Sequence, residues 1–206
     1  MSNAHLQLVM SNPRHPNRIA LFGTSADPPT AGHQTILNWL SQNYDSVVVW
    51  ASNNPFKTHQ TPLEHRSAML LILIEEINWR HNIHLYPELS NPRTFTTVEK
   101  AQTFWPDAEL TLVIGSDLVQ QLPQWYRIAE LLPQVQLLII PRPGYPVNPA
   151  DIEGLTEMGT QVAIADLDAP SVSSTAYRER GDTQALTPPI EDYIHREQLY
   201  AWQDAV

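Results

Sequence analysis

RIALFGTSADPPTAGH, residues 18–33, is the stretch of sequence that decides the fold. Its first part is a run of four apolar residues, Ile19 to Phe22, and a loop rich in proline and small residues follows. A continuous apolar run before a turn predicts a strand buried on both faces, and the pattern of residues 32–42 predicts a helix. A strand that passes through a short loop into a helix is the unit from which parallel sheets are built.

The same unit recurs along the rest of the chain. Further apolar runs that predict strands lie at residues 47–50, 83–86, 110–114 and 137–140, and a weaker one lies at 162–164. Helical patterns lie at residues 63–80, 96–104, 125–132, 174–180 and 191–200. We therefore predict an α/β fold, a single Rossmann-like doubly wound parallel sheet of about five to six strands with helices on both faces. Residues 146–159 are expected to form a loop, to which we assign no role.

Length and composition limit the kind of protein. With 206 residues, 42% of them hydrophobic, the chain has the size of one domain, which we place at residues 18–206 behind a flexible tail at residues 1–17. No run approaches the roughly 18 apolar residues of a membrane span, and no secretory leader is visible. We therefore expect a cytoplasmic protein with no membrane partner. Because the chain has no cysteine, any metal ligand would be oxygen or imidazole.

The charge of the chain favours small anionic ligands over nucleic acid. The formal net charge is −10, and only 12 residues are lysine or arginine. Since binding to a phosphate backbone depends on clustered cations, we expect no nucleic-acid partner. A small phosphorylated ligand is still compatible with this charge if the few cations gather beside backbone amides. A homo-oligomer is also compatible with the sequence.

The loop after the first strand lies where a doubly wound sheet normally binds phosphate. Gly23 allows a sharp turn, and the amides around Thr24 and Ser25 can bond an anion. His33, at the start of the helix, can offer a ring N–H to the same anion. The residues suit a capped strand–helix turn without a ligand equally well, so both interpretations stay open.

This loop carries the first resemblance to a known family. Thr30-Ala31-Gly32-His33 resembles the Thr/His-x-Gly-His signature of the nucleotidylyltransferase superfamily, and Asp27-Pro28-Pro29 is similar to its usual lead-in. The nicotinate-mononucleotide branch usually has glycine, phenylalanine and histidine where this chain has Thr24, Ala26 and Thr30. The first two departures leave open a shifted loop or a reduced rate.

Later segments resemble motifs of the nicotinate-mononucleotide adenylyltransferases in the family's order. They are Asn54 to Lys57 with Arg66 and Met69, Thr94-Phe95-Thr96, Gly115 to Tyr126, Arg142 to Tyr145, and Val172 to Arg178. Taken singly, each also has a structural interpretation, such as a surface arginine, a capped helix with a core tryptophan, or a Ser/Thr helix cap. Together they extend the resemblance over about residues 18–200.

The resemblance implies roles for individual residues. His33, Lys57 and Arg178 are the implied catalytic residues, acting on the charge of the transition state. The implied ATP-binding residues are Gly23, Thr24, Ser25, Thr30, His33, Ser173, Ser174, Thr175 and Arg178. The implied mononucleotide-binding residues are Phe95, Thr96, Gly115, Asp117, Trp125, Tyr126 and Arg142.

The resemblance also implies a reaction. AMP is transferred from ATP to nicotinate mononucleotide, giving deamido-NAD and pyrophosphate in NAD biosynthesis, with Mg²⁺ held by the ATP phosphates and not by a protein metal site. Three alternatives stay open: an enzyme that prefers nicotinamide mononucleotide, a phosphopantetheine adenylyltransferase, and a catalytically silent nucleotide-binding module. The segment from Asp117 to Trp125 opposes the second of these.

Overall fold

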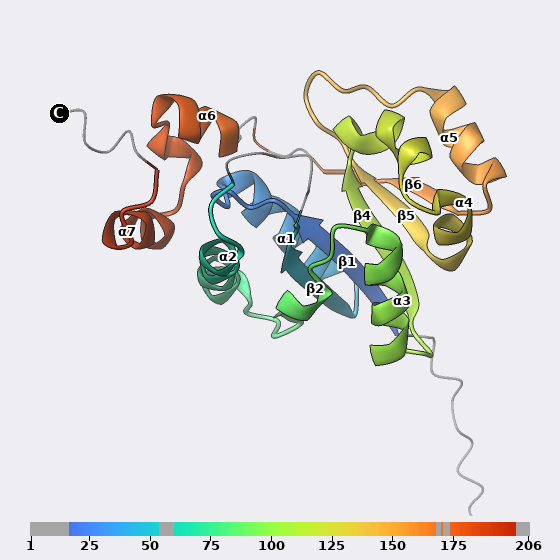
Figure 1. The fold of residues 1–206 in the computed structure, drawn as a ribbon, viewed down its shortest axis with the longest axis horizontal. Helices are drawn as coiled ribbons and strands as arrows, with labels where there is room; N and C mark the ends of the chain where they lie inside the picture. Colours follow the sequence, from blue (N-terminus) through green and yellow to red (C-terminus); the bar gives the residue numbers. More distant parts are fainter. Residues whose placement is uncertain (1–16, 54–59, 168–169, 171–173, 201–206) are drawn as a thin grey trace, which may run out of the picture.

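Six parallel strands form one sheet in the order β3-β2-β1-β4-β5-β6, as the computed structural model of the protein shows (Figure 1). The structure describes residues 17–53, 60–167, 170 and 174–200. The strands are β1 (Arg18–Thr24), β2 (Ser46–Ala51), β3 (Ile83–Leu85), β4 (Glu109–Gly115), β5 (Gln136–Ile140) and β6 (Val162–Ile164). Every strand pair is parallel, so the predicted doubly wound sheet is confirmed.

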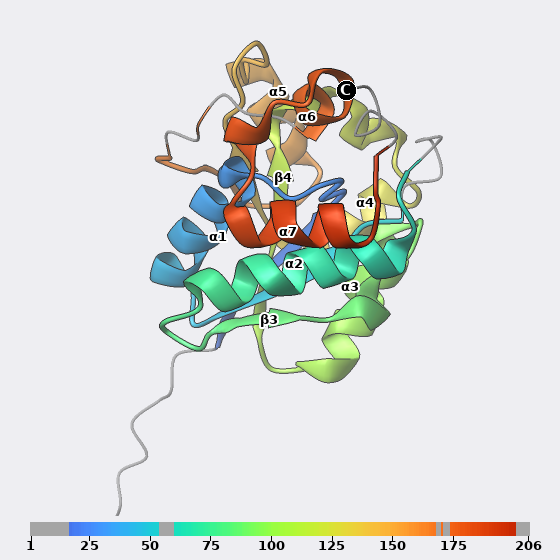
Figure 2. The ribbon, with the colours of Figure 1, turned by 90° about the vertical axis from the view of Figure 1, so that its left-hand side faces the viewer.

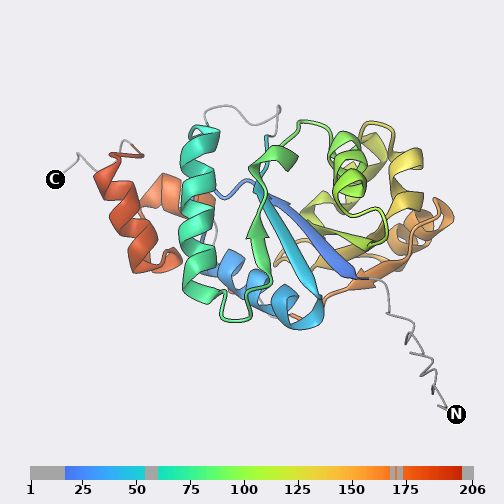
Figure 3. The same ribbon diagram turned by 90° about the horizontal axis from the view of Figure 1, so that it is seen from below.

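Helices cover both faces of this sheet (Figures 1 and 3). On one face, α1 (Ala31–Asn43) and α2 (Leu63–Ile77) pack on the side chains of β1 and β2 that point to that face. On the other face lie α3 (Thr94–Phe104), α4 (Ile128–Leu131) and α5 (Pro149–Glu157). Neighbouring residues of β1 divide between the two cores, Ala20 facing one and Leu21 the other, which is why the strand reads as continuously apolar.

The last two helices form an outer layer. α6 (Ser174–Arg180) lies near the first loop, and α7 (Pro188–Arg196) lies beside α2 on the side away from the sheet (Figure 2). Ile190 and Ile194 of α7 are fully buried against the same core as α1 and α2. Tyr200, the last described residue, is thereby brought to the loop that follows the first strand.

The order of the strands reverses between β1 and β4. The connection from β1 leads to β2 on one side, and the connection from β4 leads to β5 on the other side. Ligands of such sheets bind in the crevice outside the carboxyl ends of the strands at this switch point. The loops that follow Thr24 and Gly115 are therefore the ones placed for binding.

Four of the predicted elements need correction. Residues 146–159, expected as a loop, contain α5. This helix begins at Pro149, and its N-cap Asn148 forms a capping box with Asp151. The helix expected at residues 125–132 is only the four-residue α4, preceded by a 3-10 helix over Ser116–Gln124 and followed by another over Leu132–Gln134. The left-handed backbone of Arg127 separates the first of these segments from α4.

The long helix expected at residues 63–80 ends three residues early, at Ile77. Asn78 stops it, because its side chain exchanges two hydrogen bonds with the backbone of Ile83 at the start of β3. α7 begins earlier than expected, at Pro188, since proline suits the first turn of a helix. No helix in the described part of the chain is both long and apolar enough to span a membrane.

Candidate active site

The first loop leads directly from β1 into α1. Thr30 is the N-cap of α1 and forms a capping box with His33, the third residue of the helix. In this box the Thr30 hydroxyl accepts the His33 backbone N–H, and the His33 ring accepts the Thr30 backbone N–H at 3.1 Å. The box places the His33 side chain at the positive end of the helix dipole, where an anion binds favourably.

Both nitrogens of the His33 ring are held by threonine. Nδ1 lies 3.1 Å from the Thr30 backbone nitrogen and 2.9 Å from the Thr30 hydroxyl, and Nε2 lies 2.9 Å from Thr24 Oγ1. A backbone N–H can only donate, so Nδ1 must accept. The neutral ring therefore carries its hydrogen on Nε2 and donates it to the Thr24 hydroxyl.

Gly23 serves packing as well as the turn. A Cβ atom at this position would lie 2.5 Å from two ring carbons of Trp50, the residue paired with it on β2. Real Cβ atoms essentially never approach this closely, and Trp50 is only 4% exposed. Glycine is therefore required here by the neighbouring indole.

Arg66 lies on α2 and ties three loop segments together. Its guanidinium donates to the carbonyls of Thr61, Ser25 and Ser52 at 2.8, 2.9 and 2.8 Å. The residue is 3% exposed, so the interpretation of a surface arginine is wrong. Burial lowers the pKa of Arg66, while the nearby Asp27 carboxylate opposes the shift. Arg66 fixes the backbone after β1 and β2, and Met69 beside it is fully buried.

Asp27 joins the first loop to Tyr200, the last described residue of the chain. It is 3% exposed, and its carboxylate accepts the Tyr200 hydroxyl at 2.7 Å and the Thr61 backbone N–H at 3.4 Å. Burial raises the pKa of Tyr200 well above its usual range, and the Asp27 carboxylate adds to the rise. The sequence motifs did not single out either residue for this pairing, since 173 positions separate them.

Residues of α6 bond directly to the same loop. The Ser174 hydroxyl donates to the carbonyl of Pro28 at 2.7 Å, and the Arg178 guanidinium donates to the carbonyl of Asp27. The Arg178 guanidinium also lies 3.3 Å from the hydroxyl of Thr175. The structure thus brings the predicted residues of α6 to the first loop, across about three quarters of the sequence. Lys57 and Ser173 lie outside the described residues.

A second group of predicted residues lies at the end of β4. Arg142 Nε lies 3.3 Å from Asp117 Oδ1, and the Ser116 hydroxyl accepts the Arg142 backbone N–H at 2.9 Å. A Cβ atom on Gly115 would lie 2.3 Å from Asp117 Oδ1 and 2.7 Å from Arg142 Nε, so a larger residue would have to displace one of these side chains. Asp117 Oδ1 is buried and accepts no hydrogen bond from the described residues. Such an acceptor is suited to a ligand hydroxyl.

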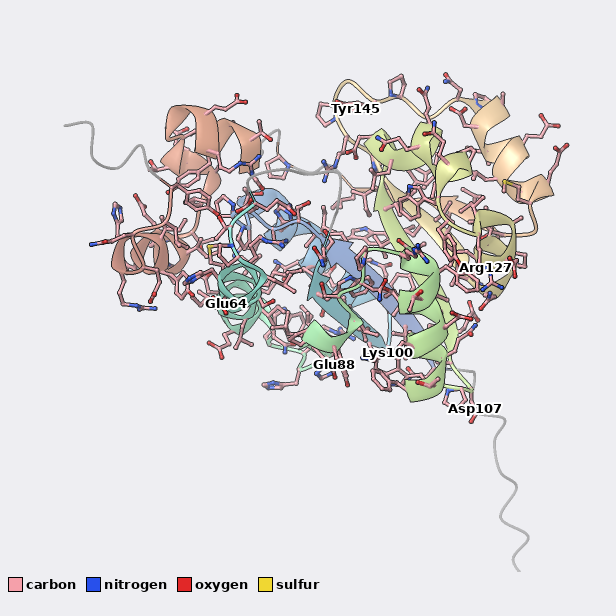
Figure 4. All side chains as sticks on the ribbon, in the orientation of Figure 1. Glu64, Glu88, Lys100, Asp107, Arg127 and Tyr145 are labelled. Atoms are coloured by element: carbon pink, nitrogen blue, oxygen red, sulfur yellow. The ribbon has the colours of Figure 1, made fainter. Side chains whose placement is uncertain are left out.

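The aromatic residues beside this group pack with arginine. The guanidinium of Arg127 lies 4.0 Å from the ring centre of Phe95, and that of Arg93 lies 4.2 Å from the ring centre of Tyr126. The two rings meet edge to face at 6.2 Å. Phe95 is 3% exposed, which leaves little of its ring for a ligand, whereas Tyr126 is 47% exposed. Figure 4 shows Arg127 projecting from the segment before α4.

Two more predicted residues, Trp125 and Thr96, are next in sequence to Tyr126 and Phe95. Trp125 is half-buried and packs against the core under α3 and α4. Thr96 is exposed in the first turn of α3, where backbone amides point out of the helix. Sequence reasoning missed Arg93 and Arg127, although Arg93 directly precedes the Thr94-Phe95-Thr96 segment and could have been found there.

A cavity of about 260 Å³ lies at the other end of the strands, away from their carboxyl ends. It is lined by residues at the amino ends of β4 and β5, among them Glu109 and Gln136. It lies away from the switch point and contains no predicted site residue, so we do not connect it with the site.

Comparison with known proteins agrees with this arrangement. The model of a protein family described as cytidylyltransferase-like matches residues 21–180. The chain is 41% identical over 197 residues to a probable nicotinate-nucleotide adenylyltransferase of Synechocystis, covering 89% of this chain and 98% of that protein. It is 30% identical over 195 residues to the nicotinate-nucleotide adenylyltransferase of Bacillus subtilis, with the same coverage of 89% and 98%.

Solved structures share the fold. The nicotinic acid mononucleotide adenylyltransferase of Plasmodium falciparum, in complex with NaAD, superposes with a TM-score of 0.76 at 21% identity. The superposition covers 90% of this chain and 98% of that one. At this level of identity the likeness bears on the fold alone, and it agrees with the parallel sheet described above.

Proposed function

The chain belongs to the nicotinate-nucleotide adenylyltransferase family of cytidylyltransferase-like proteins, and we propose that it transfers AMP from ATP to nicotinate mononucleotide at the ends of β1 and β4. One observation supports this location most directly: Ser174 and Arg178 of α6 bond the backbone of the loop that leads to His33. The Arg178 guanidinium and the His33 ring N–H, which come from opposite ends of the sequence, are thereby on elements that contact each other at the switch point of the sheet.

The proposed reaction is an in-line displacement at phosphorus. A phosphate oxygen of the mononucleotide attacks the α-phosphorus of ATP, and the bond from that phosphorus to the bridging oxygen breaks. Pyrophosphate leaves with the bonding electrons, and the product is deamido-NAD. The attacking phosphate is already ionised at neutral pH, so the rate depends on alignment and on donors placed where negative charge builds up.

In this proposal the first loop and α6 hold ATP. Gly23, Thr24, Ser25 and Thr30 supply the loop, while Ser173, Ser174 and Thr175 supply hydroxyls at the start of α6. His33, Lys57 and Arg178 stabilise the charge of the transition state. Support for His33 comes from its place at the start of α1 and from its Nε2–H, which is a hydrogen-bond donor.

The group at the end of β4 would hold the mononucleotide. Asp117 Oδ1 would accept a ribose hydroxyl, and Arg142, which is exposed beside it, would meet the phosphate. Trp125 and Tyr126 would contact the pyridine ring, with Gly115 beneath the ligand and Phe95 supporting Tyr126 from behind. The Thr96 amide in the first turn of α3 would bind an oxygen of the ring substituent.

The charge of this region favours the acid form of the pyridine substrate. Arg93 lies over the ring of Tyr126, and α3 presents its positive end at the same place, whereas the Arg127 guanidinium over Phe95 is already paired with the Glu130 carboxylate. A carboxylate gains from both features, whereas the neutral amide of nicotinamide mononucleotide gains little. We therefore propose nicotinate mononucleotide as the preferred acceptor.

The proposal also includes Mg²⁺, bound with ATP. Within the described ranges, no three histidine, aspartate or glutamate side chains gather closely enough to hold an ion. Asp27, the buried carboxylate of the first loop, is already bonded to Tyr200 and Thr61. We propose that Mg²⁺ is bound by the ATP phosphates, where it would neutralise charge on the leaving pyrophosphate.

The test is the release of pyrophosphate from Mg-ATP. It should be measured with nicotinate mononucleotide, with nicotinamide mononucleotide and with phosphopantetheine as acceptor. We expect rapid release with the first and a kcat/KM at least tenfold lower with the second. Release with phosphopantetheine alone would contradict the proposal, and silence with all three would favour a nucleotide-binding module without activity.

His33→Ala tests the catalytic assignment. Removing one preorganised donor to a developing negative charge typically costs a hundredfold or more in kcat. We expect a loss of about that size, measured as pyrophosphate release at saturating substrates. Near-normal turnover of the variant would refute the role of His33.

A further inference from the structure

The hydroxyl of Thr24 lies 2.9 Å from His33 Nε2. Thr24 is the last residue of β1 and is 8% exposed, and His33 lies in the first turn of α1. The contact therefore joins the end of the first strand to the start of the first helix through two side chains. It bridges the loop in which the sequence departs from the family pattern.

The hydrogen-bond role of His33 Nε2 follows from that of Nδ1. Nδ1 accepts the Thr30 backbone N–H, so the single hydrogen of the neutral ring is on Nε2. The Thr24 hydroxyl then accepts that hydrogen. The ring is held at both nitrogens, which fixes its plane as well as its tautomer.

Helix capping does not account for the Thr24 contact. The capping box of Thr30 and His33 already pairs the two backbone N–H groups at the start of α1. Among the described residues the Thr24 side chain makes no bond to the backbone there, and its hydroxyl contacts the ring nitrogen that carries the donor hydrogen. The contact therefore acts on the direction of the His33 N–H.

We propose that Thr24 is a positioning residue, whose hydroxyl holds the His33 Nε2–H in place until a phosphate oxygen of ATP takes that hydrogen bond. This inference rests on the proposed role of His33 in the transition state. Because the ring has only one such hydrogen, phosphate and Thr24 compete for it. A ring that is already in the right plane loses less freedom when the transition state forms.

The test uses variants at Thr24 that keep or remove the hydroxyl. Thr24→Val removes it at nearly constant shape, and Thr24→Ala is a second variant in case the valine does not fit. Thr24→Ser keeps the hydroxyl and is expected to recover most of the lost rate. The matched control is Thr35→Val, which removes a hydroxyl of the same helix that bonds the carbonyl of Ala31 at 2.9 Å.

Two readouts are measured on each full-length variant. The first is the ¹H–¹⁵N signal of the His33 Nε2–H in the ligand-free protein, identified by its loss in His33→Ala. We expect it to be protected from exchange in wild type, Thr24→Ser and Thr35→Val, and lost in Thr24→Val. The second is kcat, which should fall about 3- to 10-fold in Thr24→Val, with KM for ATP within about twofold of wild type.

The outcomes separate this inference from the function on which it rests. If Thr24→Val keeps the protected signal, or loses it with kcat unchanged, the positioning role is overturned. A rise in KM for ATP together with a fall in thermal stability would show a structural role and overturn it as well. If His33→Ala is fully active, the assignment of His33 fails, and that failure is visible without any Thr24 variant.

Discussion

Tyr200→Phe tests the link between the end of the chain and the first loop. The Tyr200 hydroxyl donates to Asp27 Oδ1 at 2.7 Å, and the carboxylate that receives it is 3% exposed. Phenylalanine keeps the ring, which packs edge to face on Tyr177 at 5.6 Å, and removes the hydroxyl with its hydrogen bonds to Asp27 and to the Thr61 side chain. A hydrogen bond to a charged group contributes about 1.5–3 kcal/mol, so the free energy of unfolding should fall by about that amount at pH 7.

The same bond predicts a dependence on pH. Burial raises the pKa of Tyr200, so the folded protein keeps the phenolic proton above pH 10, where the tyrosine of the unfolded chain loses it. The unfolded state then binds fewer protons than the folded state, and the stability of wild type falls as pH rises. The contribution of Tyr200 is therefore complete below about pH 10 and decreases by about 1.4 kcal/mol for each further pH unit.

Urea unfolding of wild type and variant at pH 7, 9, 10 and 11 measures both effects. Because all other groups titrate in both proteins, their contributions cancel in the difference. The difference should be constant from pH 7 to 9 and should narrow between pH 10 and 11. Tyr145→Phe is the control, since Tyr145 is 55% exposed, and it should differ from wild type by less than about 0.5 kcal/mol. A difference that does not narrow above pH 10 would refute the reasoning.

Two further predictions concern the two halves of the site. Arg66→Lys should lower the free energy of unfolding by about 2–4 kcal/mol in a urea titration, because an ammonium cannot replace the buried guanidinium fork that bonds three loop carbonyls. An unchanged midpoint would contradict this account of Arg66. Gly115→Ala should raise KM for nicotinate mononucleotide about tenfold while KM for ATP changes less than about twofold, because the added methyl group displaces Asp117 or Arg142. Equal changes in both constants would show that the two subsites are not separate.

The order of elements could be predicted because each strand is buried on both faces. Val47, Val48 and Val49 are all fully buried, so β2 appears in the sequence as an unbroken apolar run. The edge strand β6 gave a weaker pattern, since Ala163 and Ile164 are exposed. Element bounds were less predictable, because Asn78 and Arg127 end or interrupt helices through contacts and backbone angles that periodicity does not encode.

The site was predictable in its motifs but not in its connections. Ser174 and Arg178 could be found as part of a motif, but their bonds to the first loop depend on how α6 folds back over the sheet. The pairing of Asp27 with Tyr200 depends on the same path of the chain. Arg66 illustrates the limit in another way, because a lone arginine on a helix reads as exposed, while the structure buries it under loop carbonyls.

The departures in the first loop take on a physical meaning in the structure. At the level of sequence, Thr24 and Thr30 were two separate differences from the family pattern. In the structure both bond the ring of His33, one at each nitrogen. A glycine at position 24 would have no hydroxyl to accept the Nε2–H, so the ring would depend on position 30 alone for its orientation. We therefore expect the effects of Thr24→Gly and Thr30→Ala on kcat to be non-additive, since both substitutions act on one side chain. Additive effects on kcat would mean that the two threonines act independently of the His33 ring.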